Sequence, residues 1–184
     1  QIISLGDESL TKLLEEVWGV IDRTDAQKQQ AIDEWHAKLD GALANADLSN
    51  GRALFKKTCA TCHKLYGEGG QIGPDLTGSN RNNLGYLLEN ILDPNRAVPR
   101  QWTTTTILMK DGRVINGVVT RQTDQTWTVQ TAKDEETIPA GEIEQSQATN
   151  LSLMPEGQLN TMSDTDVRDL IGYLQSRGQV ALPE

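Results

Sequence analysis

The amino-acid sequence predicts a mainly α protein with an antiparallel β-meander insertion and an N-terminal helical hairpin. Apolar residues recur at helical spacing through the first half of the chain and again near its C-terminus. Between these parts, at about residues 100–148, β-branched residues and turn signals follow one another at the short intervals typical of strands. We therefore expect a hairpin over residues 1–47 and a second domain over residues 48–184, which the β-rich insertion interrupts.

The first helix of the hairpin is predicted by an apolar stripe made of Leu10, Leu13, Leu14, Val17, Trp18 and Ile21. Thr24 and Asp25 can cap a second helix, whose stripe consists of Ala31, Ile32, Trp35 and Leu39. The outer face of the hairpin is acidic, as on a solvated surface. The apolar seam has to be buried against the second domain or against a second copy of the chain, so we expect a monomer or a weak dimer.

The second domain is expected to open with a helix that leads to Cys59. Ser49 and Asn50 provide a capping signal, and one face of this helix carries Gly51, Leu54, Phe55 and Thr58. A glycine-rich loop follows and leads to Pro74-Asp75-Leu76. A further helix is predicted over residues 83–92, because Pro94 disfavours helical conformation in the residue before it.

The insertion is predicted to form four or five antiparallel strands. Thr103 to Met109 is β-branched and apolar, and Asp111-Gly112 is a strong hairpin signal. The later strands are indicated by Val114, Ile115, Val118, Val119, Trp127, Val129, Ile138 and Ile143.

A C-terminal helix is expected after the loop at residues 152–157. Ser163 and Asp166 form a capping box at its start. One face then carries Val167, Leu170, Ile171 and Leu174. Gly178 is expected to end this helix.

The composition narrows the classes of function. The chain has 184 residues and a formal net charge of −9. Only 36% of its residues are apolar, which suggests a small core completed by something other than protein. So acidic a chain is a poor candidate for binding nucleic acid or anionic membranes, and a better one for a partner with a basic patch. No apolar run approaches the roughly 20 residues that span a bilayer. The chain starts at Gln1, as expected of a mature or excised piece.

The strongest functional signal is the pentapeptide Cys59-Ala60-Thr61-Cys62-His63. Both cysteines of the chain lie in this window, which is shorter than the loop that a structural disulfide usually closes. Two thiols at this spacing can each form a thioether with a vinyl group of one haem, and the adjacent histidine can bind its iron. The window therefore predicts one covalently attached haem c that is held by Cys59, Cys62 and His63.

Two other interpretations of the window fit less well. A redox dithiol uses Cys-x-x-Cys at the start of a helix that follows a strand, whereas here a helix is expected to precede Cys59. A structural zinc site needs four ligands. Beyond the window the sequence offers only His36 and no third cysteine.

The second axial ligand of the iron has to come from elsewhere in the chain. Met154 is the preferred candidate, because it stands in a loop that Pro155 stiffens. Met109 in an apolar strand and Met162 before a helix cap are more typical of packing residues, and His36 of a helix surface. The predicted iron ligands are therefore His63 and Met154.

Several motifs together resemble those of class I cytochromes c: Gly51-x-x-x-Phe55, the Cys59–His63 window, Gly73-Pro74-Asp75-Leu76, Met154-Pro155 and Asp169-Leu170-Ile171-Gly172-Tyr173-Leu174. The resemblance implies the cytochrome c fold, in which the first and last helices cross, with Gly51 and Phe55 meeting Leu170 and Tyr173. It also implies that the Pro74 carbonyl holds the second nitrogen of the His63 ring. Leu76 would then pack on the haem.

A closer resemblance is to the haem-binding domain described from planctomycetes and verrucomicrobia. It covers about residues 48–177 and rests on the glycine-rich stretch before Leu76, on Lys110-Asp111-Gly112-Arg113 and on residues 152–157. That family also carries a β-rich insertion and belongs to large exported proteins. The resemblance therefore implies a periplasmic or otherwise extracytoplasmic location.

The expected function is outer-sphere electron transfer, as a carrier or as the electron-accepting domain of a dehydrogenase system. The chain would not be an enzyme, since both axial positions are filled and no substrate has to enter. Its partner would be a redox protein, either a dehydrogenase or another cytochrome. The alternative is a haem enzyme or sensor with a displaceable sixth ligand, for peroxidase chemistry or gas binding.

The β-rich insertion has two possible roles. The preferred one is that it shields one edge of the haem, and the other is that it docks a redox partner. Trp102 and Trp127 could pack against the haem, but each is equally compatible with the core of the insertion itself.

Overall fold

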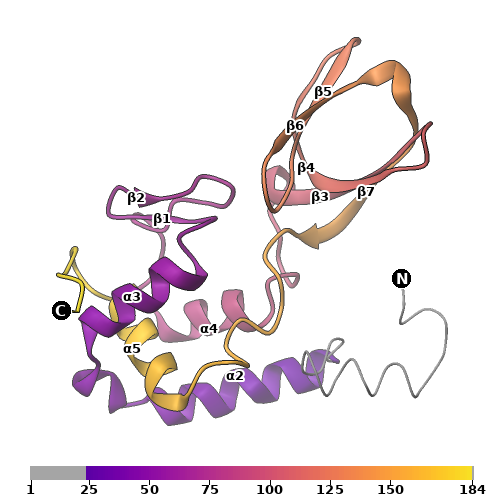
Figure 1. Cartoon of the computed structure of the whole chain (residues 1–184). Helices are drawn as coiled ribbons and strands as arrows, with labels where there is room; N and C mark the ends of the chain where they lie inside the picture. The colour runs from indigo at the N-terminus through magenta and orange to yellow at the C-terminus, as the bar shows by residue number, and fades with distance from the viewer. Residues whose placement is uncertain (1–23, 184) are drawn as a thin grey trace. The chain divides into compact units, whose positions relative to one another are not determined.

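The computed structural model describes residues 24–183 (Figure 1). Its α-helices are α2 (Asp25–Leu39), α3 (Leu48–Thr58), α4 (Leu84–Leu92) and α5 (Asp164–Leu174). Its strands are β1 (Lys64–Leu65), β2 (Glu68–Gly69), β3 (Thr103–Met109), β4 (Val114–Gln122), β5 (Thr126–Gln130), β6 (Glu135–Pro139) and β7 (Ile143–Ser152). Short 3-10 turns occur at η2 (Ala42–Asn45), η3 (Arg100–Trp102) and η4 (Ala140–Glu142). The first helix of the expected hairpin falls on residues 1–23, outside the described residues.

The prediction of a mainly α fold is wrong. Helices, with the 3-10 turns included, make up about 35% of the described residues, and strands make up about 25%. A five-stranded antiparallel sheet accounts for most of the strand content. The sequence underestimated it because β7 runs from Ile143 to Ser152 through mostly exposed, polar residues. This strand is held by backbone pairing with β3 and has little apolar alternation of its own.

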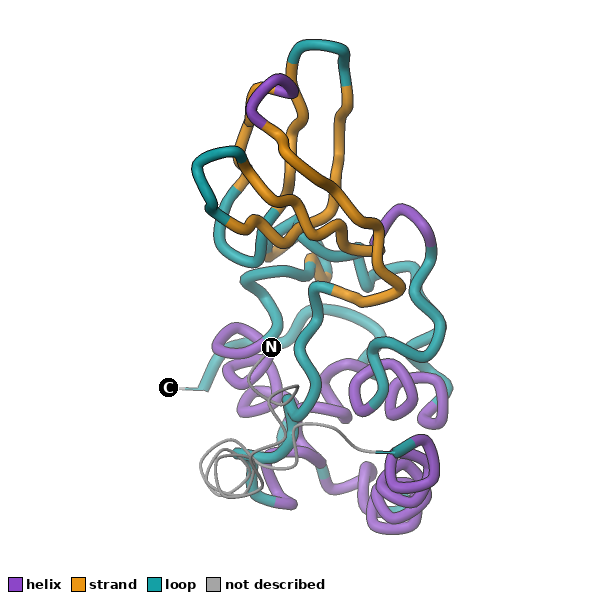
Figure 2. The backbone as a smooth tube through the Cα atoms, turned by 90° about the vertical axis from the view of Figure 1, so that its right-hand side faces the viewer, coloured by secondary structure: helices purple, strands orange, loops and turns teal. Residues whose placement is uncertain are grey.

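The strands of the sheet follow the order β6-β5-β4-β3-β7. The predicted meander is confirmed for β3 to β6, including the turn at Asp111-Gly112 between β3 and β4. The fifth strand returns through η4 and pairs with β3, so that β6 and β7 occupy opposite edges in the strand order. Figure 2 shows these strands curving around a common interior. Its core consists of Ile107, Met109, Ile115, Val129 and Ile138, which we call the sheet core.

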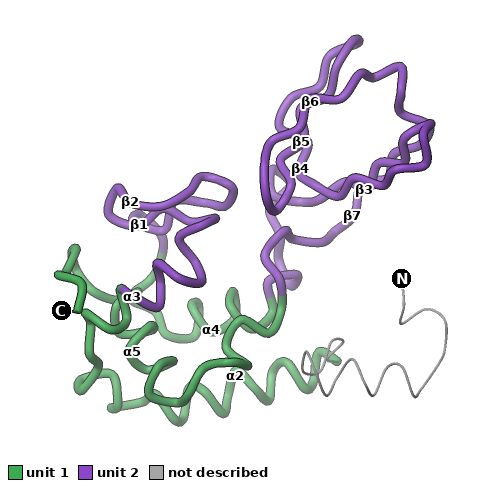
Figure 3. The backbone as a smooth tube through the Cα atoms, viewed as in Figure 1, with its two compact units in different colours: residues 1–52, 80–93, 156–184 green, residues 53–79, 94–155 purple. Residues whose placement is uncertain are grey.

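The backbone divides into two compact units (Figure 3). Among the described residues, the first contains residues 24–52, Asn80–Asp93 and residues 156–183. The second contains Ala53–Ser79 and Pro94–Pro155, and therefore both the Cys59–His63 window and the sheet.

Within the first unit, α3 and α5 cross at Gly51. A Cβ atom on Gly51 would lie 2.0 Å from the carbonyl oxygen of Asp169 and 2.7 Å from the Cβ of Tyr173. Two backbones can approach this closely only where one residue has no side chain. The contact between Gly51 and Tyr173 that the family resemblance implies is therefore present.

A buried carboxylate fixes the start of α3. Asp169, only 2% exposed, accepts hydrogen bonds from the backbone N–H of Asp47 (3.0 Å) and from the Asn50 amide (2.9 Å). Its charge is also met by the guanidinium of Arg168 at 2.8 Å. The cap itself is Asp47, which accepts from the N–H groups of Ser49 and Asn50, and α3 begins slightly earlier than the predicted signal.

Arg81 caps the C-terminal end of α5. Its guanidinium donates to the carbonyl oxygens of Leu174 and Ser176, and the side chain is buried. A cation at a helix C-terminus satisfies the last carbonyl groups and complements the helix dipole. The helix consequently ends at Leu174, before the Gly178 that was expected to terminate it.

Candidate functional site

The Cys59–His63 window directly follows the last turn of α3. The Cys59 N–H still donates to the Phe55 carbonyl at 2.8 Å, as in a helix. The N–H groups of Cys62 and His63 then both donate to the carbonyl of Cys59, at 3.1 and 2.9 Å. The window is therefore a single tight turn, and it places two thiols and an imidazole at the C-terminal end of one helix.

The His63 ring is oriented by one hydrogen bond. Its Nδ1 lies 2.9 Å from the carbonyl oxygen of Pro74. Because a carbonyl can only accept, Nδ1 must carry a proton, and in the neutral imidazole the free lone pair is then on Nε2. This is the arrangement that proteins use to orient a histidine that ligates a metal.

The loop after the window is fixed against it by backbone bonds. Gly70 donates to the Ala60 carbonyl and Gly73 to the Cys62 carbonyl, each at 2.8 Å. A Cβ on Gly73 would lie 2.7 Å from Cε1 of the His63 ring, so only glycine permits this approach. Leu76, half-buried, donates its N–H to the carbonyl of Lys64 at the start of β1. Cys59, Cys62, His63, Pro74 and Leu76 thus belong to one compact loop system.

Both thiols are free and half-buried. Burial raises the pKa of Cys59, an effect that the hydrogen bond with the Thr58 hydroxyl at 3.3 Å opposes and that the neighbouring Cys62 reinforces. Burial likewise raises the pKa of Cys62. Each thiol is thus held mostly in its protonated form at neutral pH.

Met154 belongs to the second unit but lies far from the Cys59–His63 window in the sequence. It is half-buried and lies just after β7. Its N–H donates to the Ser152 hydroxyl at 3.0 Å, and the Ser152 N–H donates to the Asn95 side chain at 2.9 Å. His63 and Met154 therefore belong to the same compact unit but to separate segments of it.

The other candidates for the second axial ligand occupy different surroundings. Met109 is part of the sheet core and is buried there, as the sequence analysis expected. Met162 is half-buried in the first unit, just before the Ser163 cap of α5. His36 is exposed on α2, also as expected.

The structure bears on the two other interpretations of the window. A redox dithiol would open a helix, whereas Cys59 follows the end of α3 and Cys62 leads into β1. For zinc, the described residues contain no group of three or more His, Cys, Asp or Glu side chains that could hold a metal ion.

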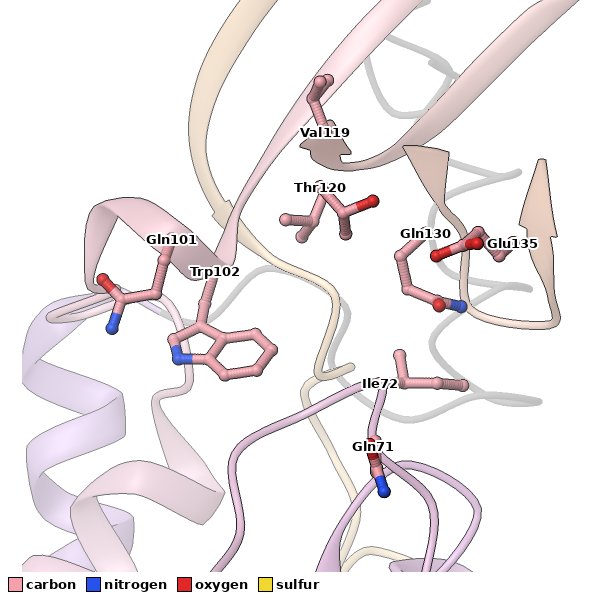
Figure 4. A pocket seen from close by; sticks show the side chains of 9 residues that line it. Gln71, Ile72, Gln101, Trp102, Val119, Thr120, Gln130 and Glu135 are labelled. Carbon is pink, nitrogen blue, oxygen red and sulfur yellow. The ribbon is translucent and has the colours of Figure 1, made fainter. Parts of the chain in front are cut away.

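A cavity that the sequence did not reveal adjoins the attachment loop (Figure 4). Its volume is about 550 Å³, and its lining includes Ile72 from the loop and Trp102, Val118 and Val119 from the insertion. Ile72 precedes Gly73, which contacts the His63 ring. Trp127, by contrast, packs against the sheet core. From the sequence, both tryptophans were candidates to pack against the haem or in the core of the insertion, and the pattern did not distinguish between them.

The comparisons with known proteins agree with this geometry. Residues 46–110 match the family model of the cbb3-type cytochrome c oxidase, subunit III. None of the curated proteins matches the chain. The matched range includes the window, Pro74 and Leu76 and ends before Met154. The match supports a cytochrome c haem-binding domain, and a domain of this kind implies covalently bound haem and haem-based electron transfer in general.

Within the part of the chain that the structure describes, no helix is long and apolar enough to cross a membrane.

Proposed function

We propose that this chain is an electron-transfer domain that holds one haem through thioethers to Cys59 and Cys62, with His63 and Met154 as axial ligands. The observation that carries the proposal is the 2.9 Å hydrogen bond between His63 Nδ1 and the Pro74 carbonyl. It gives His63 the tautomer that an iron ligand needs, and it comes from the proline that the resemblance to class I cytochromes c assigns to this role.

Bound haem supplies a one-electron ferrous–ferric couple. The chain supplies the environment that sets its potential. Cys59 and Cys62 would hold the group at the end of α3, while His63 would present Nε2 with Nδ1 held by Pro74. Met154 would provide a soft thioether, which favours the ferrous state and raises the potential.

The proposed role of the insertion is to keep water away from the attachment loop. Trp102, Val118 and Val119 of the insertion line the same cavity as Ile72, together with polar residues such as Gln130 and Glu135. A low-dielectric environment disfavours the additional charge of ferric iron. The insertion would thereby help to raise the potential rather than form a docking surface.

The proposed partner is a redox protein, either a dehydrogenase or another cytochrome, outside the cytoplasm. The net charge of −9 favours a partner with a basic docking patch. We also propose that this chain is a domain of the kind described from planctomycetes and verrucomicrobia, as the resemblance of its motifs implies.

Mass spectrometry and visible spectroscopy of the intact protein test the attachment. We expect one haem that stays bound after denaturation, and a low-spin ferrous spectrum that added carbon monoxide leaves unchanged. A protein without covalent haem would refute the proposal, and rapid carbon monoxide binding would favour an open-site enzyme or sensor.

Met154→Ala tests the second ligand, with Met162→Ala as the matched control. The first variant should keep its haem but become high-spin or water-ligated, because no sulfur then reaches the iron. The second should keep the parent spectrum, because Met162 lies just before the Ser163 cap of α5, a position more typical of a packing residue. If the two variants exchange these outcomes, Met154 is not the ligand.

A further inference from the structure

Lys28 of α2 connects two segments that are distant in the sequence. Its ammonium lies 2.9 Å from a carboxylate oxygen of Asp93 and 2.8 Å from one of Glu156. The Lys28 side chain is 11% exposed and that of Asp93 is 7% exposed. All three residues belong to the first compact unit.

This ion triad differs from an ordinary surface pair. Two carboxylates that share a largely buried space repel each other unless a cation lies between them. Removal of one partner of a buried ion pair is strongly destabilising because it leaves an uncompensated charge. Lys28 therefore bridges Asp93 and Glu156, and its removal would break this link between them.

Glu156 lies within the segment that carries Met154, here called the Met loop (residues 152–157), and Asp93 lies close in sequence to a residue that binds the start of this loop. Glu156 lies two residues after Met154 in the chain. Asp93 lies two residues before Asn95, whose side chain accepts the Ser152 N–H at 2.9 Å. Asn95, which follows α4, thus binds the start of the Met loop directly. Asp93, at the end of α4, is linked to Glu156 near the end of the loop through Lys28.

We propose that Lys28 is a positioning residue for Met154: the triad Asp93–Lys28–Glu156 holds the C-terminal side of the Met loop while Asn95 holds its N-terminal side. The inference rests on the proposed role of Met154 as an axial ligand. It assigns α2, which was expected to belong to a separate hairpin, a direct part in keeping the sixth coordination position closed. An intact triad disfavours the open loop in which the thioether has left the iron.

The test is Lys28→Met in the full haem-loaded chain, with two readouts. Because exogenous ligands bind only the open form, their apparent affinity scales with its population, and we expect carbon monoxide to convert the ferrous variant at a concentration at least about tenfold below any that converts the parent. Amide hydrogen exchange in the Met loop should accelerate by a similar factor, and this readout does not depend on haem chemistry. Lys28→Arg, which retains the cation, should restore most of the parent behaviour.

Lys38→Met is the matched control. Lys38 lies on the same helix and pairs with Asp164 at 3.0 Å, but both side chains are largely exposed, and Asp164 lies at the start of α5. This variant should leave both readouts unchanged. If Lys28→Met and Lys38→Met behave alike while Met154→Ala binds carbon monoxide, the positioning role is wrong and the ligand assignment stands. If Met154→Ala keeps the parent spectrum, the ligand assignment fails and the role of Lys28 fails with it, whatever the exchange rates show.

Discussion

His63 donates from Nδ1 to the carbonyl oxygen of Pro74, eleven residues further along the chain. A proline is suited to this position because its ring fixes the backbone angle φ and it has no N–H of its own to satisfy. The bond leaves Nε2 as the ring nitrogen that could bind a metal. The orientation of His63 is thus built into the folded loop.

Gly73→Ala should disturb that orientation. The new methyl group would lie 2.7 Å from Cε1 of His63, so the ring or the loop has to move and the bond to Pro74 has to lengthen. We expect a loss of about 1–3 kcal/mol in the free energy of unfolding, the usual cost of overpacking, together with an altered axial-ligand spectrum. Chemical denaturation and visible spectroscopy of the haem-loaded protein measure the two effects.

Gly78→Ala provides the comparison for Gly73→Ala. A Cβ at Gly78 meets nothing within 4 Å, so the same chemical change carries no steric cost there. Its stability and spectrum should match those of the parent. Equal behaviour of the two variants would show that the contact between residue 73 and His63 does not constrain the ring.

Local patterns in the sequence were sufficient to predict most of the helices. The cap at Thr24 and the capping box at Ser163 are confirmed, and the helix expected over residues 83–92 is present as α4. These features depend on side chains within three residues of the backbone groups that they satisfy, so the sequence displays them directly. The Asp111-Gly112 turn was predictable for the same reason, and Gly112 has the positive φ of 85° that such a turn requires.

Features that depend on distant partners could not be predicted. Lys28 gives no sign in the sequence of lying between Asp93 and Glu156, 65 and 128 residues away. The sequence indicated only a short strand near Ile143, whereas β7 continues through polar residues to Ser152 by pairing with β3, which adds to the strand content. Asp169, in contrast, lies inside a recognised motif, yet its role as a buried acceptor at α3 is visible only when the two helices are together.

Asp169 should contribute to stability in a pH-dependent manner. Burial by itself would raise the pKa of this carboxyl, but hydrogen bonds from Asn50, Arg168 and the Asp47 backbone outweigh it and hold the pKa below its usual range. A carboxyl whose pKa is lowered by folding stabilises the protein above its unfolded pKa of about 4 and loses that contribution as the pH falls further. Asp169→Asn should cost about 2 kcal/mol near neutral pH, the value of hydrogen bonds to a charged group. Its stability should also decline less steeply than that of the parent below about pH 4.

Asp111→Asn is the control for the pH dependence. The pKa of Asp111 is also lowered, by its hydrogen bonds with Arg113, but both side chains are exposed. Solvent screens such a pair, so this variant should unfold like the parent at every pH. Urea titrations between pH 2 and pH 7 would separate the two carboxylates, and a parallel acid decline in Asp169→Asn and the parent would remove the role of Asp169.

The two tryptophans of the insertion should respond differently to truncation, because one lines the cavity and the other packs on the sheet core. Trp127→Ala removes core contacts and should lower the stability of the sheet by up to about 3 kcal/mol, with little effect on the reduction potential. Trp102→Ala should admit more water beside Ile72 and lower the potential, because water stabilises the ferric charge, while the stability changes less. Redox titration and thermal unfolding of both variants measure these effects. A potential that falls only in Trp127→Ala, or in neither variant, would mean that the insertion does not shield the attachment loop from solvent.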